Sequence, residues 1–171
     1  MSRAVVLRII EEKDLDEAIK LEQRCYIPEA AATFSGFQFR YQYYRPFFLT
    51  AWSGSELVGI TNGIRTSQSS CGDEMKGEQA DDRNGPHLCV LTVAVAPEYR
   101  RRGIGALLLR ALIKQCTAAG IHKMILMCEQ HLIPFYEAEQ FMLHGVSSSK
   151  HGGITWYEMS RTLHTMEHLT E

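Results

Sequence analysis

Residues 100–105, with the sequence R-R-R-G-I-G, combine positive charge and glycine between two apolar segments. The apolar run His87–Val95 predicts a strand before them, and the run that begins at Ala106 predicts a helix after them. The first N–H groups of a helix lack partners within it and carry partial positive charge, which suits phosphate oxygens. Glycine lets the backbone approach such a group closely. The pattern predicts a phosphate-binding loop.

Other glycine-rich phosphate motifs do not fit this loop. A Walker loop has Lys and Ser or Thr after its last glycine, whereas Ala106 and Leu107 follow Gly105. A dinucleotide fingerprint needs a third small residue where Leu108 stands. For two glycines alone, a helix start with solvated arginines would be the simpler alternative.

The longer string over residues 93–109, V-A-V-A-P-E-Y-R-R-R-G-I-G-A-L-L-L, resembles motif A of the GNAT N-acetyltransferases. This resemblance implies acetyl-CoA as acetyl donor, with no metal ion. The backbone of Val93 and Val95 would pair with the pantetheine arm, and the amides of residues 101–106 would hold the pyrophosphate. The expected cofactor-binding residues are Val93, Ala94, Val95, Arg100, Arg101, Arg102, Gly103, Ile104, Gly105 and Ala106.

Two further segments narrow the resemblance. Residues 25–32 (C-Y-I-P-E-A-A-A) and 126–137 (L-M-C-E-Q-H-L-I-P-F-Y-E) look like the serotonin (arylalkylamine) N-acetyltransferase subfamily, the first of them like its microbial members. The resemblance implies that Tyr136 is the general acid that protonates the leaving thiolate, a role that a phenol can fill at neutral pH. A tyrosine that only packs beside Phe135 is the alternative. Met127 and Phe34 are expected at the amine pocket.

The general base departs from the subfamily pattern. Vertebrate members carry an H-x-H pair before the loop, and those positions fall on Cys89 and Leu91 here. Leucine cannot accept a proton, and a cysteine in an apolar strand is typically an inert thiol.

Three other residues are candidates for the base. Strand alternation places His87 on the same face as Cys89, Leu91, Val93 and Val95, from which it could act through water. Glu29 and Glu22 are the other two, because some members of the family use a glutamate of an early helix. The alternatives are a histidine without a role at a strand end and two solvated helix charges.

The elements that must position these residues follow from periodicity and turn chemistry. We expect an α/β fold in which helices flank a central mixed sheet, over a single acetyltransferase domain at 1–161 and a tail at 162–171. Residues 66–85 are polar and are expected to form a surface loop. Strands are expected at 5–10, 47–52, 56–65, 87–95, 123–128, 141–146 and 154–159. Helices are expected at 14–26, from about 29, at 102–118 and at 132–139.

Composition restricts the kinds of binding partner and the cellular compartment that we expect. The 171 residues carry a net charge of −2, which argues against a protein that binds nucleic acid. No apolar run approaches the ~20 residues that span a bilayer, so a cytoplasmic protein is expected. The five cysteines are scattered and form no C-x-x-C pair, which predicts reduced thiols and neither disulfides nor a zinc site.

The sequence therefore predicts an N-acetyltransferase that acts by direct attack of a primary amine on acetyl-CoA in a ternary complex. A small arylalkylamine or polyamine is the expected acceptor. A protein acetyltransferase for lysine or N-termini, and a CoA-binding module with little catalysis, are the alternatives. Monomer and homodimer both remain open.

Overall fold

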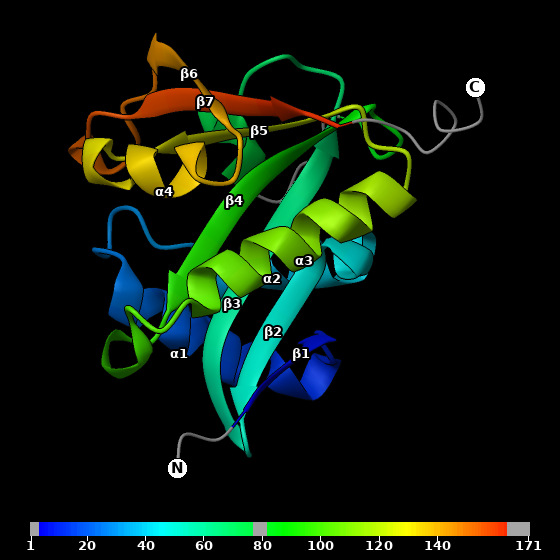
Figure 1. Ribbon diagram of the computed structural model, residues 1–171, viewed down its shortest axis with the longest axis vertical. Coiled ribbons are helices and arrows are strands. Elements are labelled where there is room, and N and C mark those ends of the chain that lie inside the picture. Colours follow the sequence, from blue (N-terminus) through cyan, green and yellow to red (C-terminus); the bar gives the residue numbers. More distant parts are fainter. Residues whose placement is uncertain (1–3, 77–81, 164–171) are drawn as a thin grey trace.

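One mixed sheet organises residues 4–76 and 82–163, which the computed structural model describes (Figure 1). The strand order in this seven-stranded sheet is β1-β2-β3-β4-β5-β7-β6, and β4 and β5 are its parallel neighbours. The strands are β1 Val5–Ile9, β2 Phe48–Ser53, β3 Glu56–Thr66, β4 His87–Val95, β5 Lys123–Cys128, β6 Met142–Val146 and β7 Tyr157–Thr162.

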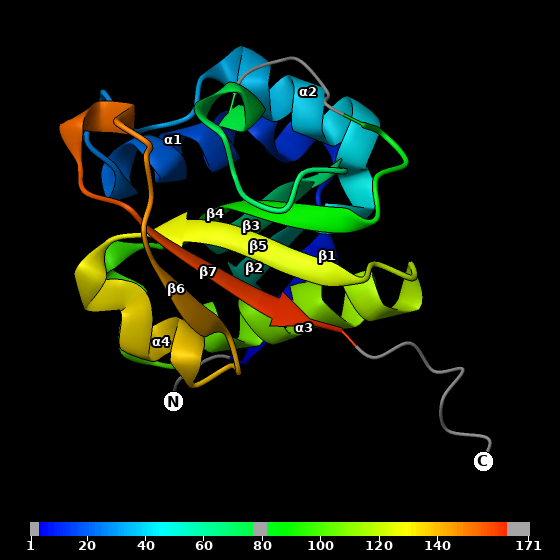
Figure 2. The same ribbon diagram turned by 90° about the horizontal axis from the view of Figure 1, so that it is seen from above.

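Helices cover both faces of the sheet (Figure 2). Helices α1 (Leu15–Cys25) and α2 (Phe34–Tyr44) lie on one face, and α3 (Ile104–Ala118) and α4 (Ile133–Glu137) lie on the other. The buried apolar side chains form two clusters between the sheet and these helices, and the expected mixed sheet flanked by helices is confirmed. Within the described residues, no helix is long and apolar enough to cross a membrane.

Strands β4 and β5 pair over a short distance only. Their parallel register runs from His87 opposite Lys123 to Val90 opposite Leu126. The second half of β4, residues 91–95, therefore pairs with β3 alone, and its other edge is open to side chains and ligands.

A β-bulge interrupts β4 at the same point. Asn62 of β3 opposes Thr92, whereas the next residue, Gly63, opposes Val90, so Leu91 is the extra residue. A bulge shifts the alternation of side chains by one position. The expected common face for His87, Cys89 and Val93 is therefore wrong.

Most element boundaries lie within two residues of expectation, and the second helix and the last strand differ by more. The second helix does not begin near Glu29: residues 28–30 form a turn, and α2 starts at Phe34 after Thr33, whose side chain accepts the Gly36 N–H at 3.1 Å as an N-cap. The last strand is β7, which runs to Thr162, and Leu163 is buried. The sheet thus reaches the first residue of the expected tail, whose residues 164–171 lie outside the described part.

The thiol prediction is wrong for one pair. Cys71 and Cys89 form a disulfide across a sequence separation of 18 residues. The segment after β3 returns over the sheet and brings Cys71 to within a Cα–Cα distance of 6.2 Å of Cys89 on β4. Cys25, Cys116 and Cys128 are free thiols.

Candidate active site

A cavity of about 620 Å³ opens where β4 has separated from β5. The loop after β4 and the first turn of α3 form one wall, and the segment from Glu129 to Tyr136 forms the other. Nine of the ten expected cofactor-binding residues line this cavity, at the end of β4, in the loop after it and in the first turn of α3. They are Val93, Ala94, Val95, Arg100, Arg101, Gly103, Ile104, Gly105 and Ala106.

The loop presents the start of α3 to this cavity. Gly103 is the N-cap residue, with a left-handed φ of +81°, and the Leu107 N–H donates to its carbonyl at 3.0 Å. The N–H groups between them are therefore the first of the helix, which have no partners within it. Arg100 Nε donates to the Val95 carbonyl at 3.1 Å and so holds the loop.

Arg102 is the tenth residue of the expected set and does not line the cavity. Its guanidinium lies 5.0 Å from the centre of the Tyr99 ring. The carbonyls of Val93 and Val95, expected at the pantetheine arm, already accept hydrogen bonds from Tyr26 at 3.1 Å and from Arg100.

Gly103→Val is expected to abolish acetyl-CoA binding, because it strains the N-cap backbone and places a branched side chain beside the helix N–H groups. Gly120→Val is the matched control. Gly120 lies just beyond the opposite end of α3, has a φ of +75° and, like Gly103, has no atom within 4 Å of an added Cβ. Isothermal titration calorimetry with acetyl-CoA compares the two variants. Equal affinities would contradict the phosphate-binding role of the loop.

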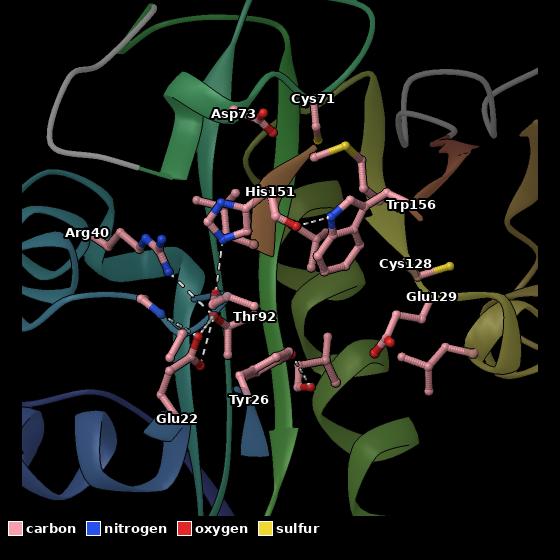
Figure 3. Close-up of a pocket in the computed structure, with 18 of the residues that line it drawn as sticks. Glu22, Tyr26, Arg40, Cys71, Asp73, Thr92, Cys128, Glu129, His151 and Trp156 are labelled. Carbon is pink, nitrogen blue, oxygen red and sulfur yellow. Dashed lines mark hydrogen bonds between the residues drawn. The ribbon is translucent and has the colours of Figure 1, made fainter. Parts of the chain in front are cut away.

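A second cavity, of about 270 Å³, is shown in Figure 3, and it shares part of its lining with the first. Five residues line both cavities, and they therefore mark the junction between them. They are Tyr26, Val93, Glu129, Leu132 and Tyr136.

A buried polar network lies at one side of the second cavity. Glu22 is 3% exposed, and its carboxylate accepts the Ala32 N–H at 3.2 Å and the Thr92 hydroxyl at 3.3 Å. Arg40 Nη1 donates to Asn62 Oδ1 at 2.9 Å. Burial lowers the pKa of Arg40 to about 10, and the negative charge of Glu22 opposes this shift. The guanidinium is thus charged at neutral pH.

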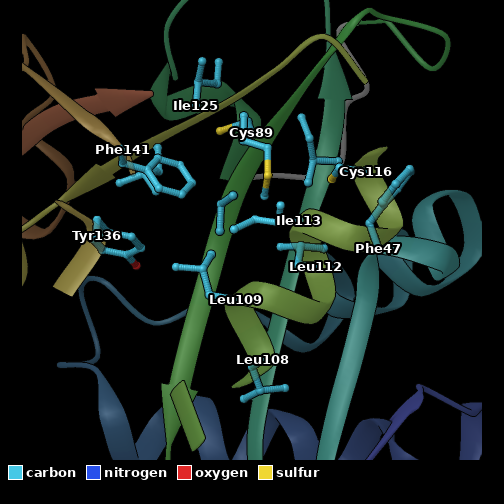
Figure 4. Close-up of a cluster of buried hydrophobic side chains, with 14 of the residues drawn as sticks. Phe47, Cys89, Leu108, Leu109, Leu112, Ile113, Cys116, Ile125, Tyr136 and Phe141 are labelled. Atoms are coloured by element: carbon cyan, nitrogen blue, oxygen red, sulfur yellow. The ribbon is translucent and has the colours of Figure 1, made fainter. Parts of the chain in front are cut away.

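Two tyrosines stand at the junction. Tyr136 is 6% exposed and packs edge-on against Phe135 and Phe141, with ring centroids 5.0 and 5.7 Å away (Figure 4). Burial, and then the neighbouring Cys128, raise the pKa of Tyr136 well above its usual value. Burial likewise raises the pKa of Tyr26. Both phenols are therefore protonated at neutral pH.

Among the other expected site residues, only Met127 lines the second cavity, where it accepts a hydrogen bond from Ser147 at 3.2 Å. Glu29 is exposed in the turn before α2, and Phe34 is 39% exposed at the start of that helix. Neither residue lines either cavity.

His87 lies at the opposite end of β4. It lies six positions before Val93, a distance of about 20 Å along a strand, and it lines neither cavity. Burial lowers the pKa of His87, and the charges of Lys123 and His122 lower it further. Of the three candidate bases, Glu22 lines the second cavity, and His87 and Glu29 line neither cavity.

His87→Ala is therefore expected to leave the acidic limb of the pH–rate profile in place. The measurement is kcat/KM for the amine between pH 5 and 9. A shift of that limb would restore His87 as the base.

Some lining residues had no assigned role in the sequence. Arg40 stands within an aromatic stretch, where an isolated charge is a weak sign of a buried polar contact. His151 and Trp156 come from the connection between β6 and β7, and no local pattern marks them.

Comparisons with known proteins show the family and the fold of this chain. Residues 15–140 match the family model described as acetyltransferase (GNAT) family. Human serotonin N-acetyltransferase is 35% identical over 83 residues, which are 47% of this chain and 40% of that protein, so the match spans less than half the length of this relative.

Solved structures share the fold at low identity. The loading GNATL domain of CurA from Lyngbya majuscula superposes with a TM-score of 0.83 and 14% identity, over 94% of this chain and 98% of that one. Arabidopsis thaliana Naa50, in complex with a bisubstrate analogue, gives a TM-score of 0.73 and 16% identity over 93% and 99% of the two chains. At such identities these structures show the fold alone, whereas the family model covers most of the chain. The chain belongs to the GNAT family of acetyltransferases.

Proposed function

We propose that this protein transfers the acetyl group of acetyl-CoA to a small primary amine by direct attack in a ternary complex. The observation that carries the proposal is the junction of two cavities at Tyr26 and Tyr136. One cavity is walled by a phosphate-binding loop, and the other contains a buried carboxylate. A donor and an acceptor bound in them would meet at this junction.

The chain supplies the groups that hold the donor. The first N–H groups of α3 and the side chain of Arg101 would bind the pyrophosphate, and the open edge of β4 would lie along the pantetheine arm. When bound, acetyl-CoA supplies an activated acetyl group as a thioester. Its sulfur would then lie near Tyr136.

The proposed reaction transfers one acetyl group from sulfur to nitrogen, and two protons leave the amine in each turnover. The amine nitrogen attacks the thioester carbonyl, the C–S bond breaks, and the thiolate takes the phenolic proton of Tyr136. The proton lost by the amine passes through water to Glu22, and Tyr136 regains a proton from solvent. An amine with a pKa near 10 also arrives protonated, and Glu22 accepts that first proton for release to solvent.

The second cavity, which we name the acceptor cavity, has features that favour a small amine as the acceptor. Its volume of about 270 Å³ is at the low end for small-molecule sites. The carboxylates of Glu22 and Glu129 complement an ammonium group, and the rings of Tyr26 and Trp156 offer aromatic surface. These features suit an arylalkylamine or a polyamine.

An acceptor panel tests the proposal. Tryptamine-type amines, polyamines and histone-like peptides are each supplied with acetyl-CoA, and free thiol release is followed. Turnover of small amines is the expected result. Turnover of peptides alone would favour a protein acetyltransferase, and tight acetyl-CoA binding without turnover would favour a binding module.

A further inference from the structure

The connection between β6 and β7, residues 147–156, crosses the acceptor cavity, and we name it the roof. Two of its residues, His151 and Trp156, line the cavity. His151 Nε2 donates to the Ala30 carbonyl at 3.1 Å, and Trp156 Nε1 donates to the His151 carbonyl at 2.8 Å (Figure 3). The roof is thereby joined to the loop between α1 and α2 on the far side of the cavity.

Close packing reinforces this contact. Gly152 has a φ of +64°, and a Cβ added there would lie 3.1 Å from the Ala30 Cβ and 3.4 Å from the Ala30 nitrogen. A side chain at this position would push the roof away from the loop. The cavity is therefore closed on this side by backbone as well as by side chains.

A second contact anchors the roof to the segment after β3. The Ser149 hydroxyl donates to the Asp73 carboxylate and accepts the His151 N–H at 3.2 Å. Two residues before Asp73, the disulfide between Cys71 and Cys89 fixes this segment to β4. Cys71 and Asp73 both line the acceptor cavity. A continuous chain of contacts thus runs from β4 through the disulfide to the roof.

We propose that this disulfide-anchored roof sets the size limit of the acceptor, an inference that rests on the proposed function. While the disulfide is intact, the cavity admits small amines and excludes the end of a polypeptide. A dithiol reductant breaks the S–S bond, supplies two electrons and two protons, and becomes a cyclic disulfide. The freed segment gains conformational entropy, the anchor of Ser149 loosens, and larger amines enter.

The test compares a small acceptor with a large one in both redox states. Tryptamine and a tetrapeptide with a free amino terminus are acetylated with and without dithiothreitol, and thiol mass labelling confirms cleavage of the disulfide. The peptide-to-tryptamine ratio of kcat/KM is expected to rise about tenfold on reduction, the scale on which pocket shape discriminates substrates. The KM for acetyl-CoA is expected to stay unchanged, because neither cysteine lines the larger cavity.

Variants separate the effect of loosening the roof from any general effect of the reductant on the enzyme. Cys71→Ser with Cys89→Ser should show the raised ratio without dithiothreitol and no further response to it. Ser149→Ala and Gly152→Ala should raise the ratio while the disulfide remains intact. Ser148→Ala is the matched control for Ser149→Ala, because Ser148 is the exposed neighbour of that serine.

The outcomes distinguish a failure of the proposal about the roof from a failure of the proposed function. Turnover of tryptamine with the same ratio in both redox states would overturn the role of the roof and leave the function standing. Turnover of the peptide in preference to tryptamine while the disulfide is intact, or of neither acceptor in either state, would overturn both.

Discussion

Replacing Tyr136 by phenylalanine is expected to lower kcat about a hundredfold, within the range of 10²–10⁴ that general acid catalysis contributes. The substitution removes the hydroxyl and keeps the ring, so the edge-on contacts with Phe135 and Phe141 remain. Without the phenolic proton, the thiolate must leave unprotonated or take a proton from water. Acetyl-CoA affinity is expected to change little, because the loop at residues 100–105, proposed to bind the pyrophosphate, is untouched.

Steady-state kinetics and calorimetry with acetyl-CoA measure the two quantities. Tyr43→Phe is the matched control, since Tyr43 is 38% exposed on α2 and lines neither cavity. Because burial raises the pKa of Tyr136, its proton should remain in place beyond the usual tyrosine range near pH 10. Unchanged turnover in Tyr136→Phe would remove the general-acid role.

Glu22→Gln is expected to lower kcat/KM for the amine about a hundredfold at pH 7, because the amide cannot accept the proton. Glutamine keeps an acceptor for Thr92 and for the Ala32 N–H, so the local contacts remain possible. The loss should shrink about tenfold per pH unit as the pH approaches the amine pKa near 10, since more substrate then arrives as free amine. This recovery separates a lost base from a damaged cavity.

Glu29→Gln is the comparison, because Glu29 was the equivalent candidate in the sequence and lies exposed in a turn. A thermal melt of Glu22→Gln is needed beside the kinetics, since the variant removes a negative charge near the buried Arg40. A pH-independent loss in Glu22→Gln, or an equal loss in Glu29→Gln, would contradict the assignment of Glu22 as the base.

Sequence patterns predicted the order of the elements because local periodicity carries most of that information. The strand at His87–Val95 and the glycine loop after it are both local features. The start of α2 was misplaced because alanines near residue 30 favour helix, whereas the turn at 28–30 and the Thr33 cap decide where the helix begins. The bulge at Leu91 was not visible, because it depends on the register with β3.

The acceptor side of the site was less predictable than the donor side. The loop proposed to bind phosphate is one continuous string, whereas the proposed acceptor cavity joins side chains such as Glu22, Thr92 and Trp156 from distant parts of the chain. The partnership of Cys71 and Cys89 depends on how a polar segment folds back, which spacing alone does not reveal. His87 was one of three candidates for the base because alternation along the strand placed it on the face of Val93, and the bulge that changes this face depends on the register with β3.

The short pairing of β4 with β5 has a consequence for the folded ensemble. Four residue pairs join β5, β7 and β6 to the rest of the sheet, so these strands can open as a cooperative unit at a lower free energy than global unfolding. A ligand in the larger cavity contacts β4 on one side and residues 129–136 on the other. At a hundred times its Kd such a ligand stabilises the closed form by about 2.7 kcal/mol. Amide hydrogens of β5 and β7 should then exchange more slowly with solvent, while those of β1 and β2 change less.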